Sequence, residues 1–157
     1  MTATPASDRE LVLTRVIDVP REKLWRCWTE PKLMLQWFTP APWKTIHAET
    51  DVRPGGSSYV VMQGPDGQEM PNRGVYLEVV KNEKLVFTDA YTRAWEPSGK
   101  PFFTGILTFE DAGPGKTKYT ARVRHWTVAD RDAHEKMGFH EGWGIATSQL
   151  EALAQKL

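Results

Sequence analysis

The stretch TVADRDAHEKMGFHEGWGIATSQLEALAQKL, residues 127–157, decides the fold. Six of its apolar residues recur at steps of three and four, which places their side chains on one stripe of a helix. They are Phe139, Trp143, Ala146, Leu150, Leu153 and Leu157. Thr127 and Asp130 have the spacing of a capping box at a helix start. We therefore predict one long C-terminal helix, roughly 40 Å long at ~1.5 Å per residue.

A helix of that length can bury its apolar stripe only against a surface of similar length. The preceding residues form short segments with strand-like alternation, separated by turns rich in Gly and Pro. Because tight turns favour antiparallel pairing, we expect a curved antiparallel sheet and an α+β fold class. A glycine inside a helix costs ~1 kcal/mol relative to alanine. Gly138, Gly142 and Gly144 therefore indicate a close backbone approach or an opening beside the helix.

The predicted order of elements is one strand, two short helices, six strands and the long helix. The two short helices are expected over residues 20–30 and 32–37. The strands are expected over residues 10–19, 43–52, 57–63, 74–80, 84–92, 102–110 and 117–126. A longer loop is expected over residues 94–101. Residues 9–157 are predicted to form a single domain after a flexible tail over residues 1–8.

The composition is that of an ordinary globular domain. Of 157 residues, 40% are hydrophobic and 25% charged, and 20 basic residues balance 20 acidic ones. No basic run breaks this balance, which argues against nucleic acid as a partner. The single cysteine, Cys27, excludes an intrachain disulfide, and its apolar surroundings are typical of a buried packing residue. With no signal-peptide pattern and no apolar run of ~18 residues, we expect a cytoplasmic protein without membrane insertion.

Several short motifs, in order along the chain, resemble one protein family. They are Val19–Trp25, Glu30-Pro31, Val52–Gly56, Gly64–Gly67, Asn72–Val79, Lys84–Thr88, Gly142-Trp143 and Leu150–Leu153. Together they are similar to the activator of heat-shock protein 90 ATPase homologue family, within the START-related helix-grip superfamily, SRPBCC. The resemblance covers nearly the whole chain. It implies a fold like that of the birch-pollen allergen, in which seven antiparallel strands grip the C-terminal helix around an apolar cavity.

Such a cavity would be lined by aromatic and Met side chains with a few polar groups, although the same residues also fill ordinary cores. Tyr119 and His125 share the strand face expected to point toward the cavity. Asp89 shares a face with Leu85 and Phe87, but the opposite face is nearly as apolar, so its side of the sheet stays open. The candidate lining residues are Trp37, Phe38, Met62, Met70, Asp89, Tyr91, Trp95, Phe103, Tyr119, His125, Met137, His140 and Trp143.

The four histidines do not have the spacing of a metal site. His134 and His140 are six residues apart, on roughly opposite faces of a helix, whereas a helical zinc pair is four apart. No metal or other cofactor is therefore expected. The sequence also has no Ser–His–Asp pattern, nucleophile elbow or phosphate loop. A catalytic site would require His125, Asp89 or His140 to converge within hydrogen-bonding reach.

Three functions follow from these observations. The leading hypothesis is a non-enzymatic protein that binds a small apolar or aromatic ligand between the sheet and the C-terminal helix. The second, implied by the resemblance, is an interaction with the heat-shock protein 90 chaperone that activates its ATPase. The third is a cyclase- or hydrolase-like enzyme that uses the same cavity. Exposed strand edges and the seven tryptophans are also compatible with a homodimer.

Overall fold

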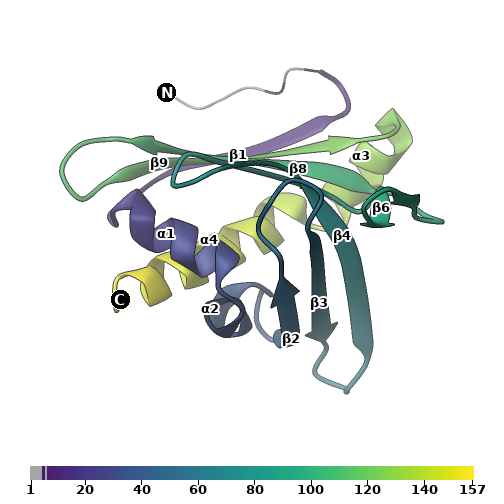
Figure 1. Cartoon of the computed structure of the whole chain (residues 1–157), viewed down its shortest axis with the longest axis horizontal. Helices are drawn as coiled ribbons and strands as arrows, with labels where there is room; N and C mark the ends of the chain where they lie inside the picture. Colours follow the sequence, from purple (N-terminus) through teal and green to yellow (C-terminus); the bar gives the residue numbers. More distant parts are fainter. Residues whose placement is uncertain (1–4, 6) are drawn as a thin grey trace.

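The computed structural model of the chain describes residue 5 and residues 7–157; of the predicted flexible tail, residues 1–4 and 6 lie outside the described residues. Seven antiparallel strands form one sheet in the order β1-β9-β8-β5-β4-β3-β2 (Figure 1). They are β1 Glu10–Ile17, β2 Lys44–Thr50, β3 Ser57–Gln63, β4 Glu69–Val80, β5 Lys84–Thr88, β8 Phe103–Asp111 and β9 Thr117–His125. The α+β class and the seven-stranded sheet are confirmed.

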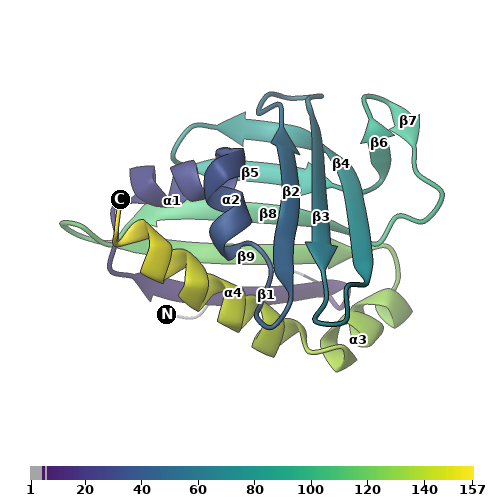
Figure 2. The same cartoon turned by 90° about the horizontal axis from the view of Figure 1, so that it is seen from below.

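Two short helices, α1 Arg21–Thr29 and α2 Pro31–Trp37, follow β1 as predicted. In Figure 1 the strands β2, β3 and β4 turn away from β1, β8 and β9, so that the sheet curves around the helices. Figure 2 shows α1, α2 and α4 on the same face of this sheet. The predicted loop over residues 94–101 contains part of a small separate hairpin, β6 Tyr91–Arg93 and β7 Glu96–Pro97. No helix in the described part of the chain is both long and apolar enough to cross a membrane.

The predicted long C-terminal helix packed on the sheet is confirmed, but it is not continuous from Thr127. The segment forms two helices, α3 Val128–Lys136 and α4 Phe139–Ala154. The predicted start is correct, because the backbone N–H of Asp130 donates to the Thr127 hydroxyl at 3.0 Å. The helix is interrupted at Gly138, whose φ of +97° lies in the left-handed region that favours glycine. Gly138 therefore marks the start of α4 and is not a helix-interior glycine.

The apolar stripe begins only after this break. Phe139, Ala146 and Leu150 of α4 are buried, whereas α3 has no buried residue. Trp143 and Leu153 are partly buried and pack against the same core. The stripe is therefore confirmed as the face by which α4 packs on the sheet.

Cys27 is a packing residue, as its sequence context predicts. It is completely buried in the main apolar cluster, and burial raises the pKa of its thiol to about 11. Its backbone carbonyl accepts a hydrogen bond from the indole N–H of Trp37 at 2.9 Å. This bond ties α1 to α2 at the end of the sheet where the helices meet.

Candidate functional site

Two adjoining cavities lie between the sheet and the helices. The first, here called the sheet compartment, has a volume of about 140 Å³ and lies against β3, β4 and β5. The second, the helix compartment, has a volume of about 360 Å³ and extends to α3 and α4. The two compartments share six lining residues, which are Trp28, Phe38, Met62, Asn72, Phe87 and Phe103. They are therefore neighbouring parts of one largely aromatic space.

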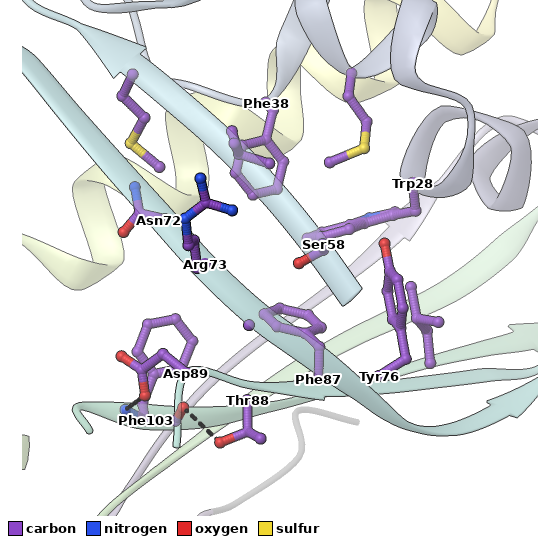
Figure 3. Close-up of a pocket in the computed structure, with 15 residues that line it drawn as sticks. Trp28, Phe38, Ser58, Asn72, Arg73, Tyr76, Phe87, Thr88, Asp89 and Phe103 are labelled. Carbon is purple, nitrogen blue, oxygen red and sulfur yellow. Dashed lines mark hydrogen bonds between the residues drawn. The ribbon is translucent and has the colours of Figure 1, made fainter. Parts of the chain in front are cut away.

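The sheet compartment carries most of the polar groups. Its polar side chains include those of Ser58, Asn72, Arg73 and Asp89 (Figure 3). Two aromatic rings also line it, Phe38 after the end of α2 and Phe87 in β5. Like Phe87, Leu85 lines this compartment. Asp89 also lines it, but it lies one residue beyond the end of β5, and Thr88 lines the compartment as well, so its position follows from the end of the strand and not from alternation.

Backbone donors hold the Asp89 carboxylate in place. Its Oδ1 accepts hydrogen bonds from the N–H groups of Phe102 at 2.8 Å and Phe103 at 3.2 Å. Burial raises the pKa of the Asp89 carboxyl, and the two N–H groups partly offset that increase by favouring the carboxylate. Asp89 is therefore a fixed acceptor at the wall of the sheet compartment.

The helix compartment has a different character. No charged side chain of the described residues lines it, and its polar groups come from Trp28, Asn72, Tyr119, His134 and Thr147. Burial raises the pKa of the Tyr119 phenol far above neutral pH, so this group remains an uncharged hydroxyl. The compartment is suited to an uncharged and mainly apolar molecule.

Trp28 is the residue that joins the two compartments. Its ring stacks on Trp143 with centroids 6.5 Å apart and meets the edge of Trp37 at 4.9 Å. The indole Nε1 is buried and makes no hydrogen bond of good geometry within the described part of the chain. Its N–H does approach the Tyr119 hydroxyl closely enough to lower the pKa of that phenol slightly, against the larger effect of burial. An unpaired buried N–H costs ~1–3 kcal/mol. An acceptor atom on a bound molecule would recover that free energy.

The structure places nine of the thirteen predicted lining residues in the walls of these compartments. They are Trp37, Phe38, Met62, Met70, Asp89, Phe103, Tyr119, Met137 and Trp143. Met70 and Met137 are 50% and 74% exposed, so they lie at the rim of the helix compartment.

The other four candidates lie elsewhere. Trp95 is 60% exposed and packs edge-on against Tyr91, with the ring centroids 5.5 Å apart, so neither residue lines a compartment. His140 is exposed, and its Nε2 lies 3.4 Å from a carboxylate oxygen of Glu135. His125 is buried behind the wall of the helix compartment.

The three residues required for catalysis do not converge. Asp89 bonds to backbone N–H groups, His140 to Glu135, and His125 to the Arg9 carbonyl oxygen and to His134. None of these bonds joins one of the three to another. Within the described residues, no group of three or more His, Cys, Asp or Glu is arranged to hold a metal ion.

The sequence analysis missed the pairing of His125 with His134. Nε2 of His125 lies 2.8 Å from Nδ1 of His134. The rings of Phe102, Phe103 and Phe139 surround His134, with centroids 4.9, 5.5 and 5.2 Å away. The one signal in the sequence was the predicted cap at Thr127, which starts α3 only three residues after His125, the last residue of β9.

Acidification is expected to destabilise the protein through His134. Burial and the nearby His125 lower the pKa of His134 from 6.5 to about 4. Between these two values the unfolded chain binds a proton at this ring and the folded chain does not, so the free energy of unfolding falls as the pH falls. Because the ring is only partly buried, we expect a loss on the order of 1–2 kcal/mol, measured by urea unfolding at pH 7 and pH 4.5. His134→Phe should lose less over the same interval, and an equal loss would contradict this assignment.

Comparison with known proteins agrees with this architecture. A family model described as Activator of Hsp90 ATPase homolog 1-like protein matches residues 18–155. A solved protein from Nitrosomonas europaea is 39% identical, with a TM-score of 0.92 and coverage of 97% of both chains. A solved protein from Mycobacterium smegmatis is 24% identical, with a TM-score of 0.77 over 93% of this chain and 90% of that chain. A Staphylococcus aureus protein described as of unknown function is 20% identical, with a TM-score of 0.67 over 94% and 93%. No curated protein matches the chain.

Proposed function

Since the chain belongs to the family of Activator of Hsp90 ATPase homolog 1-like proteins and has the helix-grip fold, we propose that it binds a small apolar or aromatic molecule. The molecule would lie between the sheet and α4. The observation that carries this proposal is the helix compartment, about 360 Å³ in volume and walled mainly by aromatic and Met side chains. Small-molecule sites have this size range and this kind of wall.

The packing of the rest of the core supports an occupant. Protein interiors normally contain few voids larger than a water molecule. Here Leu24, Leu107 and Leu150 are fully buried in the main apolar cluster, and none of them lines either compartment. An open apolar space beside a well-packed core is the arrangement expected of a ligand site.

Tryptophan fluorescence provides a direct test. Trp28 and Trp143 line the helix compartment, whereas Trp95 is exposed and lies outside it. Titration with naphthalene and other small aromatic compounds should produce a saturable change in emission. Trp95→Phe should keep this change, and Trp143→Phe should reduce it. The absence of a saturable change across a panel of apolar and aromatic compounds would contradict the proposed function.

A further inference from the structure

The hydrogen bonds of the histidine pair have only one possible direction when both rings are neutral. Nδ1 of His125 lies 2.9 Å from the backbone carbonyl oxygen of Arg9, which can only accept. Nδ1 of His125 therefore carries the proton, and its Nε2 carries a lone pair. His134 must then donate from Nδ1 to that lone pair across 2.8 Å.

This direction determines what His134 presents to the helix compartment. With its proton on Nδ1, the neutral ring has a lone pair at Nε2. The two nitrogens of an imidazole point in different directions, so Nε2 is directed away from His125, which meets Nδ1. Since His134 lines the compartment and His125 does not, we infer that Nε2 faces the compartment. Nε2 has no hydrogen-bond partner among the described residues. Phe102, Phe103 and Phe139 pack around the ring and restrict its rotation.

We propose that the helix compartment selects uncharged aromatic molecules that carry a hydroxyl or N–H group, and that Nε2 of His134 accepts the hydrogen bond from that group. This inference rests on the proposed function and names the class of ligand for the same site. His134 is a binding residue in this account. Two successive hydrogen bonds, from His125 to the Arg9 carbonyl oxygen and from His134 to His125, fix the tautomer in which Nε2 of His134 is an acceptor.

The remaining groups of the compartment agree with a phenol-like ligand. The Trp28 N–H is a buried donor that approaches the Tyr119 hydroxyl without making a hydrogen bond of good geometry in the described chain. A ligand hydroxyl can accept a hydrogen bond from it as well as donate one. A carboxylate would meet the lone pair of His134, and no cation of the described residues lines the compartment to neutralise it. An uncharged ligand with a donor therefore fits the walls better than an acid.

Three probes of similar shape separate the effect of the donor from that of the ring. They are 2-naphthol, which donates and accepts, 2-methoxynaphthalene, which only accepts, and naphthalene, which does neither. We expect the wild-type protein to bind 2-naphthol about fivefold to tenfold more tightly than 2-methoxynaphthalene, the effect of one net hydrogen bond. Isothermal titration calorimetry at pH 7 measures the three dissociation constants.

Two variants assign the preference to one residue. His134→Phe keeps an aromatic ring among the surrounding phenylalanines and removes the acceptor, so it should bind 2-naphthol and 2-methoxynaphthalene equally. His140→Phe makes the same change at an exposed histidine outside the compartment and should keep the wild-type preference. In the wild-type protein, nitrogen-15 NMR of the imidazole should show Nε2 of His134 responding to 2-naphthol and not to naphthalene. This last measurement does not depend on the folding of a variant.

The outcomes distinguish the two proposals. Equal binding of all three probes by the wild-type protein would overturn the selection by His134 and leave the apolar site intact. A preference that persists in His134→Phe, or an Nε2 resonance unchanged by 2-naphthol, would overturn it as well. Failure of all three probes to bind would overturn the proposed function together with this inference.

Discussion

Replacing Gly142 with leucine is expected to weaken the binding of apolar ligands by at least about tenfold without lowering the melting temperature. Gly142 lies in α4 at the wall of the helix compartment. A Cβ atom at this position would lie 3.9 Å from Cγ of Pro40, which is an ordinary contact. The rest of a leucine side chain would occupy ligand space, while replacing a helix-interior glycine gains ~0.5–1 kcal/mol of helix stability.

The neighbouring glycine of the same helix provides the control. Gly144 does not line either compartment, and a Cβ there would lie 3.6 Å from a guanidinium nitrogen of Arg15. Gly144→Ala should therefore gain helix stability and keep wild-type affinity for naphthalene. Calorimetric titration and thermal unfolding measure the two properties side by side. Wild-type affinity in Gly142→Leu would show that the ligand lies somewhere other than the helix compartment.

The sequence predicted the elements better than their arrangement. The sequence pattern placed β3 over Ser57–Gln63 with the observed bounds, and it placed the last strand over residues 117–126, one residue longer than β9. It did not reveal which strands are neighbours. The pairing of β1 with β9 joins residues about a hundred positions apart, and local pattern contains no information on such a contact.

That pairing also explains a buried charge that the sequence analysis did not single out. Glu10 is 1% exposed, and its carboxylate accepts hydrogen bonds from Arg122 and Arg124 of the adjacent strand. A glutamate at the start of a strand resembles an exposed residue until the partner strand is known. A buried carboxylate needs such partners, and only the strand order supplies them.

Most of the apolar wall was predicted, and of the polar groups Asp89 and Tyr119 were predicted but His134 was not. Apolar candidates such as Trp143 were recognised because they share a stripe or a strand face with core residues. His134 was missed because the segment was predicted to be one continuous helix. The break at Gly138 instead makes α3 a separate short helix beside β9. A glycine inside a helical pattern can be a packing site or a break, and only its φ angle distinguishes the two.

The largest expected loss of stability comes from Gly56→Ala, in the Pro54-Gly55-Gly56 turn before β3. A Cβ atom on Gly56 would lie 1.8 Å from the backbone carbonyl oxygen of Asp51, so main-chain atoms would have to move. The turn has little freedom to do so, because the Gly56 N–H donates to the Arg53 carbonyl and the Tyr76 N–H donates to the Gly56 carbonyl. We expect a loss on the order of 3 kcal/mol and a fall in melting temperature of roughly 6–12 °C.

Two other glycines make this a graded comparison. Gly67 has a φ of +85° and open space around it, so alanine there should cost only backbone strain, ~1–2 kcal/mol. Gly99 has open space and no positive φ, so Gly99→Ala should change stability by less than about 0.5 kcal/mol. Urea unfolding of the three variants should give the order Gly56, Gly67, Gly99, and a Gly56→Ala loss no larger than that of Gly67→Ala would contradict the steric argument. Because Tyr76 lines the sheet compartment and its backbone is bonded to Gly56, the same variant should also weaken ligand binding in the molecules that remain folded.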